Sequence, residues 1–191
     1  MLNVVLFGAP GAGKGTQAIM LADKHHLVHL STGDILRKEI AAGSELGKLA
    51  QGFTEKGELV PDEVIIGIIR SQIEQNPEAK GFIFDGFPRT TAQAEALDKM
   101  LEEKGLGITS MIALDVAREE LVKRLQIRGE SSGRADDQSL DVISNRIDVY
   151  HQKTAPLVGY YNAQGKYNPI DGVGEISEIF ERLNRHMEQL P

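Results

Sequence analysis

The stretch LFGAPGAGKGT, residues 6–16, decides the expected fold. It continues an apolar run, and the residues that follow it have the apolar periodicity of a helix, so it has a strand–loop–helix context. Gly8, Gly13 and Lys14 have the spacing of a phosphate-binding loop, in which backbone N–H groups and the helix N-terminus surround phosphate oxygens. The motif therefore predicts an ATP phosphate site, with Lys14 reaching the β- and γ-phosphates.

The end of this loop departs from the common pattern. A Ser or Thr usually follows the lysine and its hydroxyl binds magnesium, whereas here Gly15 follows and Thr16 comes one position later. Asp85 ends the apolar run FIFD, and an acid at the end of a neighbouring strand holds magnesium in phosphate-loop proteins. We expect phosphate oxygens and water to hold Mg²⁺, with Asp85 in its outer shell. The alternative for Asp85 is a turn-capping role before Gly86.

Short apolar runs bounded by turn residues recur along the chain and are typical of buried parallel strands. They occupy residues 3–7, 27–30, 82–84, 111–116 and 167–170. Segments of helical period lie between them, for example from Val64 to Ile73 and from Ile176 to Met187. This alternation predicts an α/β fold with a mainly parallel sheet flanked by helices.

Two stretches interrupt the alternation and predict insertions at the edge of the sheet. Residues 31–60 contain two short helical patterns and no strand, whereas residues 127–137, IRGESSGRADD, are polar and look like a loop. The expected organisation is a single domain over residues 1–191, with its core in residues 1–30, 61–126 and 138–191.

Composition excludes several classes of protein. The 191 residues include no cysteine, which rules out disulfides and thiolate metal sites, and the five histidines lack metal-ligand spacing. A net charge of −7 is unfavourable for binding a nucleic-acid backbone, and no apolar run is long enough to span a membrane. We expect a cytoplasmic protein with no nucleic-acid or membrane partner. The lack of an exposed apolar stripe favours a monomer.

Six of the ten arginines lie near the inserts or the expected strand ends: Arg37, Arg89, Arg124, Arg128, Arg134 and Arg146. Any one of these arginines, taken alone, is by default a solvated surface residue. Together they favour phosphoryl transfer between two nucleotides, because both substrates are anions and the guanidinium group binds phosphate in a bidentate way.

The motifs, taken in order, resemble those of the adenylate kinase family along nearly the whole chain. They are GAPGAGKGT at 8–16, STGD at 31–34, KGELVPDE at 56–63, FDGFPRT at 84–90 with Gln93, and GRADD at 133–137 with Arg146. The resemblance implies a five-stranded parallel core with two mobile parts, an NMP-binding domain at residues 31–60 and a lid at residues 127–137. It also implies reversible transfer, in which ATP and AMP give two ADP with Mg²⁺.

The resemblance further implies the site residues. ATP would be held by Gly11, Ala12, Gly13, Lys14, Gly15, Thr16, Arg128 and the backbone near Gly174, with Arg124 assisting. AMP would be held by Thr32, Arg37, Glu58, Leu59, Val60, Gly86, Phe87, Pro88, Arg89 and Gln93. Arg134 and Arg146 would bridge the phosphates of both nucleotides. The catalytic charges would come from Lys14 and five of the arginines (Arg89, Arg124, Arg128, Arg134 and Arg146).

Two features distinguish this chain from relatives of the same fold. The expected lid is short and has no cysteine, so it resembles the short-lid form without a structural zinc. Kinases that act on UMP or CMP typically have Ala and Asn where this chain has Thr32 and Gln93, and the Gln93 amide can bind both donor and acceptor on an adenine edge. A UMP/CMP-type kinase remains an alternative, as does a non-catalytic ATP-binding switch.

Overall fold

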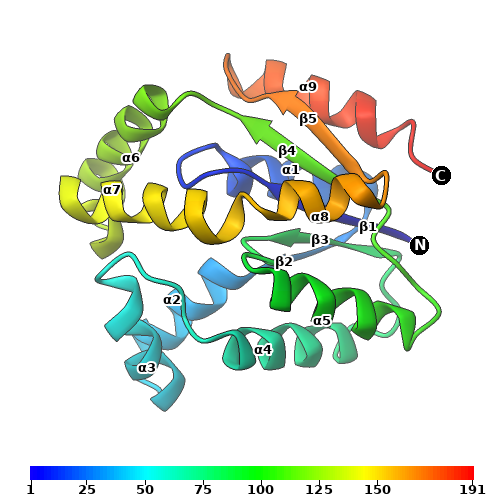
Figure 1. The fold of residues 1–191 in the computed structure, drawn as a ribbon, viewed down its shortest axis with the longest axis horizontal. Helices are drawn as coiled ribbons and strands as arrows, with labels where there is room; N and C mark the ends of the chain where they lie inside the picture. Colours follow the sequence, from blue (N-terminus) through cyan, green and yellow to red (C-terminus); the bar gives the residue numbers. More distant parts are fainter.

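The computed structural model describes residues 1–191 and contains one parallel sheet of five strands in the order β2-β3-β1-β4-β5. The strands are β1 (Leu2–Phe7), β2 (Val28–Ser31), β3 (Gly81–Asp85), β4 (Ser110–Asp115) and β5 (Tyr167–Asp171). Leu6 of β1 pairs with Asp85 of β3 and with Ile112 of β4. The carboxyl ends of the central strands therefore lie at one edge of the sheet, and the predicted α/β fold with its five strands is confirmed (Figure 1).

Two apolar cores cover the two faces of the sheet, because neighbouring strand residues point to opposite faces. Val5, Phe7 and Phe84 pack on one face, and Val4, Leu6 and Ile83 pack on the other. The first core includes side chains of α4 (Asp62–Glu74), α5 (Thr91–Glu102) and α8 (Leu157–Ala163). The second includes side chains of α1 (Lys14–His25), α6 (Arg118–Ser132), α7 (Leu140–Val149) and α9 (Ile176–Met187).

The first insert consists of two helices, α2 (Thr32–Ala42) and α3 (Glu45–Thr54), as the sequence predicts. The Ser31 hydroxyl accepts a hydrogen bond from the Asp34 N–H at the start of α2, and Gly43 ends that helix in a left-handed conformation with φ 64°. In Figure 1 the two helices lie beside the sheet, at the lower left. The loop that follows them returns the chain to α4.

The expectation that residues 127–137 form a loop is wrong. Helix α6 continues to Ser132 and ends at Gly133, which has φ 64°, and a 3₁₀ helix, η1 (Ala135–Asp137), follows. A Cβ on Gly129 would lie 2.3 Å from the carbonyl oxygen of Asp137, so this glycine lets the last turn of α6 pack directly on η1. The polar composition reflects a helix that is exposed on most sides.

Helices α7 and α8 are joined by a π-helical turn, η2 (Tyr150–Thr154), rather than by a loop. The three segments follow one another as a rod across the sheet in Figure 1, with a turn at Ala155 and Pro156 between η2 and α8. No helix in the structure combines the length and the apolar character that crossing a membrane requires.

Candidate active site

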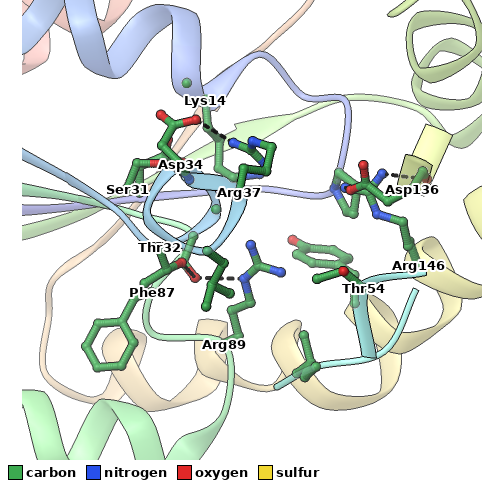
Figure 2. Close-up of a pocket in the computed structure, with 18 of the residues that line it drawn as sticks. Lys14, Ser31, Thr32, Asp34, Arg37, Thr54, Phe87, Arg89, Asp136 and Arg146 are labelled. Atoms are coloured by element: carbon green, nitrogen blue, oxygen red, sulfur yellow. Dashed lines mark hydrogen bonds and ion pairs between the residues drawn. The ribbon is translucent and has the colours of Figure 1, made fainter. Parts of the chain in front are cut away.

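A cavity of about 710 Å³ opens at the carboxyl edge of the sheet. Its lining comes from the loop after β1, the first insert, the loop after β3, and the facing parts of α6, η1, α7 and η2. In Figure 2, Arg37, Arg89 and Arg146 approach one region from different sides. The predicted site residues that line the cavity are Gly11, Gly13, Lys14, Gly15, Thr16, Thr32, Arg37, Glu58, Leu59, Val60, Asp85, Gly86, Phe87, Pro88, Arg89, Gln93, Arg128, Arg134 and Arg146.

The phosphate-binding loop is shaped by its glycines. Gly11 and Gly13 have φ values of 87° and 95°, which other residues rarely adopt. A Cβ on Gly11 would lie 3.0 Å from the Leu121 carbonyl oxygen and from Leu125, so the loop rests directly against α6. Ala12 is buried behind the loop, at 1% exposure, and does not line the cavity.

Lys14 folds back over this loop. Its Nζ donates to the carbonyl oxygens of Gly8 at 2.7 Å and Ala9 at 3.1 Å. Burial lowers the pKa of Lys14 to about 8; the Asp85 carboxylate opposes this shift, and Arg89 and other nearby arginines reinforce it. An anionic phosphate in the cavity would restore the preference for the charged ammonium.

Asp85 lies beside the same loop. A Cβ on Gly15 would be 3.6 Å from Asp85 Oδ2, and the same oxygen lies 3.3 Å from His29 Nε2. Burial acts to raise the pKa of Asp85, but the His29 hydrogen bond and the Lys14 charge outweigh it, and the pKa lies below its ordinary value. The carboxylate is thus ionised at neutral pH and offers hard oxygen atoms, which fit Mg²⁺.

No group of three or more His, Asp or Glu side chains converges to hold a metal ion. Asp85 alone is therefore an incomplete ligand set, and phosphate oxygens and water would have to supply the rest. His29 was not singled out in the sequence, because nothing in the short apolar run LVHL indicates that its side chain reaches a residue on the neighbouring strand.

A second group of contacts surrounds the loop after β3. The Thr32 hydroxyl donates to the Gly86 carbonyl oxygen at 2.9 Å, and Arg89 Nε donates to the same oxygen at 2.7 Å. Gln93 Oε1 accepts the Arg89 N–H at 2.8 Å, while Gln93 Nε2 donates to Asp62 Oδ1 at 2.8 Å. These bonds fix which way the buried amide faces.

One N–H and one lone pair of the Gln93 amide make no hydrogen bond within the protein, because each side of the group makes only one of its two possible bonds. That pair of functions still matches an adenine edge. Its partner Asp62 was missed, since the sequence shows it only as an acid at the start of a helix.

Three aspartates hold the arginines on the other sides of the cavity. Arg37 pairs with Asp34. Arg128 binds Asp137 through two hydrogen bonds of 2.6 and 3.0 Å, and Arg146 binds both Asp137 and Asp136.

The Asp137 side chain is fully buried between two guanidinium groups. Burial acts to raise the pKa of Asp137, but hydrogen bonding to Arg128 and the charge of Arg146 hold it below its ordinary value. The carboxylate therefore stays charged at neutral pH and fixes both arginines at the edge of the cavity.

Two further predicted residues do not line the cavity. Arg124 donates to Glu120 at 2.8 Å and to the Gly172 carbonyl oxygen at 3.2 Å. Gly174 has φ 124°, and a Cβ on this residue would lie 2.6 Å from Glu178 Oε2. The structure thus leaves Arg124 and Gly174 outside the lining of this cavity.

Known proteins are similar to this chain in sequence along nearly its whole length. A family model described as adenylate kinase matches residues 6–166. An adenylate kinase from Parabacteroides distasonis is 54% identical over 183 residues, which cover 96% of each chain. Adenylate kinases from Phocaeicola vulgatus and Flavobacterium psychrophilum are each 52% identical over 190 residues, covering 100% of both chains. The resemblance inferred from the motifs is confirmed.

Proposed function

The chain belongs to the adenylate kinase family and is an ATP:AMP phosphotransferase, and from this premise we propose how its cavity divides between the two nucleotides. The observation that carries the proposal is that the phosphate-binding loop and the arginine-rich walls line one continuous cavity. ATP takes the end formed by Gly11–Thr16 and Arg128. The backbone near Gly174 and Arg124, which lie outside the cavity lining, would contact the part of ATP that extends beyond it. AMP takes the end formed by the first insert and the loop after β3.

At the AMP end, different residues bind the phosphate and the adenine base. Arg37 and Arg89 bind the AMP phosphate, since their guanidinium groups line the cavity and carry charge that is suited to it. Thr32, the Glu58–Val60 segment and Gln93 surround the adenine, and the free functions of the Gln93 amide recognise its edge. Arg134 and Arg146 reach the phosphates of both nucleotides.

The reaction is a direct in-line transfer without a covalent intermediate. The AMP phosphate oxygen is already anionic, so it attacks the γ-phosphorus of ATP without a protein nucleophile. The chain supplies positioning and charge: Lys14 and the arginines stabilise the equatorial oxygens of the transferred group.

Magnesium enters with ATP. When bound, it neutralises charge on the β- and γ-phosphate oxygens. Asp85 would lie in the outer shell of the ion and would accept a hydrogen bond from a water bound to it, and His29 bonds the carboxylate beside the loop. Neither residue has to exchange a proton in the reaction.

Water competes with AMP for the γ-phosphoryl group, so the site must close before transfer. We assign this closure to residues 31–60, as the NMP-binding insert, and residues 127–137, as the lid. A monomer as the active form and a cytoplasmic location remain predictions from the sequence.

A panel of acceptors tests this assignment. ATP and Mg²⁺ are mixed with AMP, UMP, CMP or GMP in turn, and diphosphate formation is measured. A strong preference for AMP supports the proposal. A preference for UMP or CMP would favour the pyrimidine kinase alternative, and ATP binding without any transfer would favour a switch.

A further inference from the structure

The π-helical turn η2 (Tyr150–Thr154) interrupts a rod that is otherwise α-helical. The Ala155 N–H donates to the Tyr150 carbonyl oxygen at 2.8 Å, five residues back instead of four. Each added residue turns the following side chains by about 100° around the helix axis. Such turns are rare and frequently lie at functional sites.

Thr154 is the side chain whose environment the turn changes most clearly. In a regular α-helix a threonine hydroxyl can bond the carbonyl oxygen four residues back, which here is that of Tyr150. In the π turn that oxygen accepts the Ala155 N–H. The Thr154 hydroxyl instead leaves the helix and donates to the Arg89 carbonyl oxygen at 2.8 Å.

This hydrogen bond completes the support of Arg89. The N–H of Arg89 is held by Gln93, and its Nε is held by the Gly86 carbonyl oxygen. Both partners lie within the same loop and the first turn of α5. Thr154, which is 6% exposed and lines the cavity, ties that loop to a different element, 65 residues away in sequence.

The same rod carries two other parts of the site. Arg146 lies in α7, eight residues before Thr154, and lines the cavity. The Tyr150 ring packs against Phe7, with ring centroids 5.6 Å apart, and Phe7 is the last residue of β1 before the phosphate-binding loop. One helical segment thus contacts the base of the ATP loop, bears Arg146 and holds the backbone of Arg89.

We propose that Thr154 is a positioning residue for phosphoryl transfer. Its hydroxyl, directed by the π turn, fixes the Arg89 loop relative to Arg146, so that both guanidinium groups meet the AMP phosphate at a set separation. The inference deepens the proposed function, because it rests on the assignment of Arg89 to that phosphate.

Thr154→Val tests the inference, since valine keeps the shape and removes the hydroxyl. Loss of one neutral hydrogen bond, with the misplacement that follows, should raise the KM for AMP about five-fold and lower kcat by a similar factor. The KM for ATP should stay within about two-fold, because the phosphate-binding loop keeps its own contacts. Thr154→Ser retains the hydroxyl and should restore the AMP kinetics.

Thr109→Val is the matched control. The Thr109 hydroxyl oxygen accepts the Asn3 N–H at 3.2 Å, and Thr109 does not line the cavity. Loss of this hydrogen bond should lower Tm without changing the KM for AMP. If Thr154→Val does not fold, Thr154→Ala is measured against Thr154→Ser in the same way.

The outcomes separate the inference from its premise. If Arg89→Ala raises the KM for AMP but Thr154→Val leaves AMP kinetics within two-fold, the inference is overturned and the assignment of Arg89 stands. If the serine variant fails to restore the kinetics, or both KM values rise equally, the role is structural and the inference is overturned. An unchanged KM for AMP in Arg89→Ala overturns the assignment of Arg89 and the inference with it.

Discussion

The two ends of the cavity are built in different ways. The ATP end is a contiguous loop, residues 8–16, in which glycines shape the backbone and Lys14 bonds only to carbonyl oxygens. At the other walls, the arginines come from separate elements, and three of them are paired with aspartates, namely Arg37, Arg128 and Arg146. One end is set by local sequence, and the other depends on the packing of distant segments.

The difference has a chemical consequence. The Lys14 ammonium lacks a carboxylate partner within ion-pair distance. Burial lowers the pKa of Lys14, and an incoming phosphate would be the first anion to pair with it. Arg37, Arg128 and Arg146 are instead paired with Asp34, Asp136 and Asp137. Phosphate that binds Arg37, Arg128 or Arg146 must therefore join or displace an existing ion pair, whereas phosphate that binds Lys14 does not.

Replacing Lys14 should have the largest effect on activity. Lys14→Met removes the only side-chain charge of the loop, and we expect kcat to fall about 100- to 1000-fold. The fold should survive, because the side chain bonds only to two carbonyl oxygens of its own loop. Steady-state ADP formation measures kcat, and Tm measures whether the fold is intact. Near-normal turnover in a folded Lys14→Met variant would contradict the assignment of the loop.

Arg89→Ala should act mainly on AMP. The guanidinium provides charge-assisted hydrogen bonds, so its loss should raise the KM for AMP about 10- to 100-fold and slow transfer, with the KM for ATP changed far less. Initial rates at varied AMP and at varied ATP separate the two constants. Equal changes in the KM for AMP and the KM for ATP would show that Arg89 does not act mainly on AMP.

Asp137→Asn tests the acid that the arginine end requires. Removing one member of a buried charged group leaves Arg128 and Arg146 poorly paired, and the free energy of unfolding at pH 7 should fall by about 2 kcal/mol. Urea unfolding measures the loss, with Asp141→Asn, an exposed acid of α7, as the control.

The same variant has a predicted pH signature. The pKa of Asp137 is lower in the folded protein than in the unfolded chain, so its carboxylate stabilises the fold above about pH 4. That stabilisation is lost as the pH falls through the lower, folded pKa. The wild type should therefore lose more stability than Asp137→Asn on acidification. Parallel pH profiles for the two proteins would contradict the role of Asp137.

The pH dependence of ATP binding tests the other end. With the pKa of Lys14 at about 8, most of the free enzyme carries the ammonium at pH 7 and little of it does at pH 9. ATP affinity should therefore fall about ten-fold between these values, with a proton taken up on binding at the higher pH. Titration calorimetry in two buffers measures both quantities. Lys14→Arg, which stays charged, should bind with little pH dependence, and an equally flat wild-type profile would contradict the shifted pKa.

Arg124→Ala should have the smallest effect. Arg124 does not line the cavity and is already bonded to Glu120 and to the Gly172 carbonyl oxygen. We expect kcat and the KM for AMP to change less than about three-fold, with any larger change confined to the KM for ATP. A loss of kcat comparable to that of Arg89→Ala would place Arg124 in the catalytic group after all.

The sequence predicted the parts of the molecule that depend on neighbours along the chain. The five strands follow from short apolar runs, and the phosphate-binding loop follows from Gly8, Gly13 and Lys14 in their strand–loop–helix context. Helix α2 lies within the helical patterns predicted for residues 31–60, and the structure shows that Ser31 caps it and Gly43 ends it. These features are local, so their signals survive without knowledge of the packing.

The contacts between distant segments could not be predicted in the same way. Asp62 holds Gln93 across 31 residues, His29 meets Asp85 across 56, and Thr154 meets Arg89 across 65. Each partner is an ordinary residue in its own segment. The helical end of α6 was missed for a related reason, since Gly129 looks like a helix breaker until its close packing on Asp137 is known.

The central claim is that the γ-phosphoryl group passes directly from one end of the cavity to the other. Its most direct test uses ATP whose γ-phosphorus is chiral through sulfur and oxygen isotopes, with AMP as acceptor. A single in-line transfer inverts the configuration at phosphorus, and we predict inversion in the ADP formed. Retention would require two successive transfers through a group on the protein and would contradict the account.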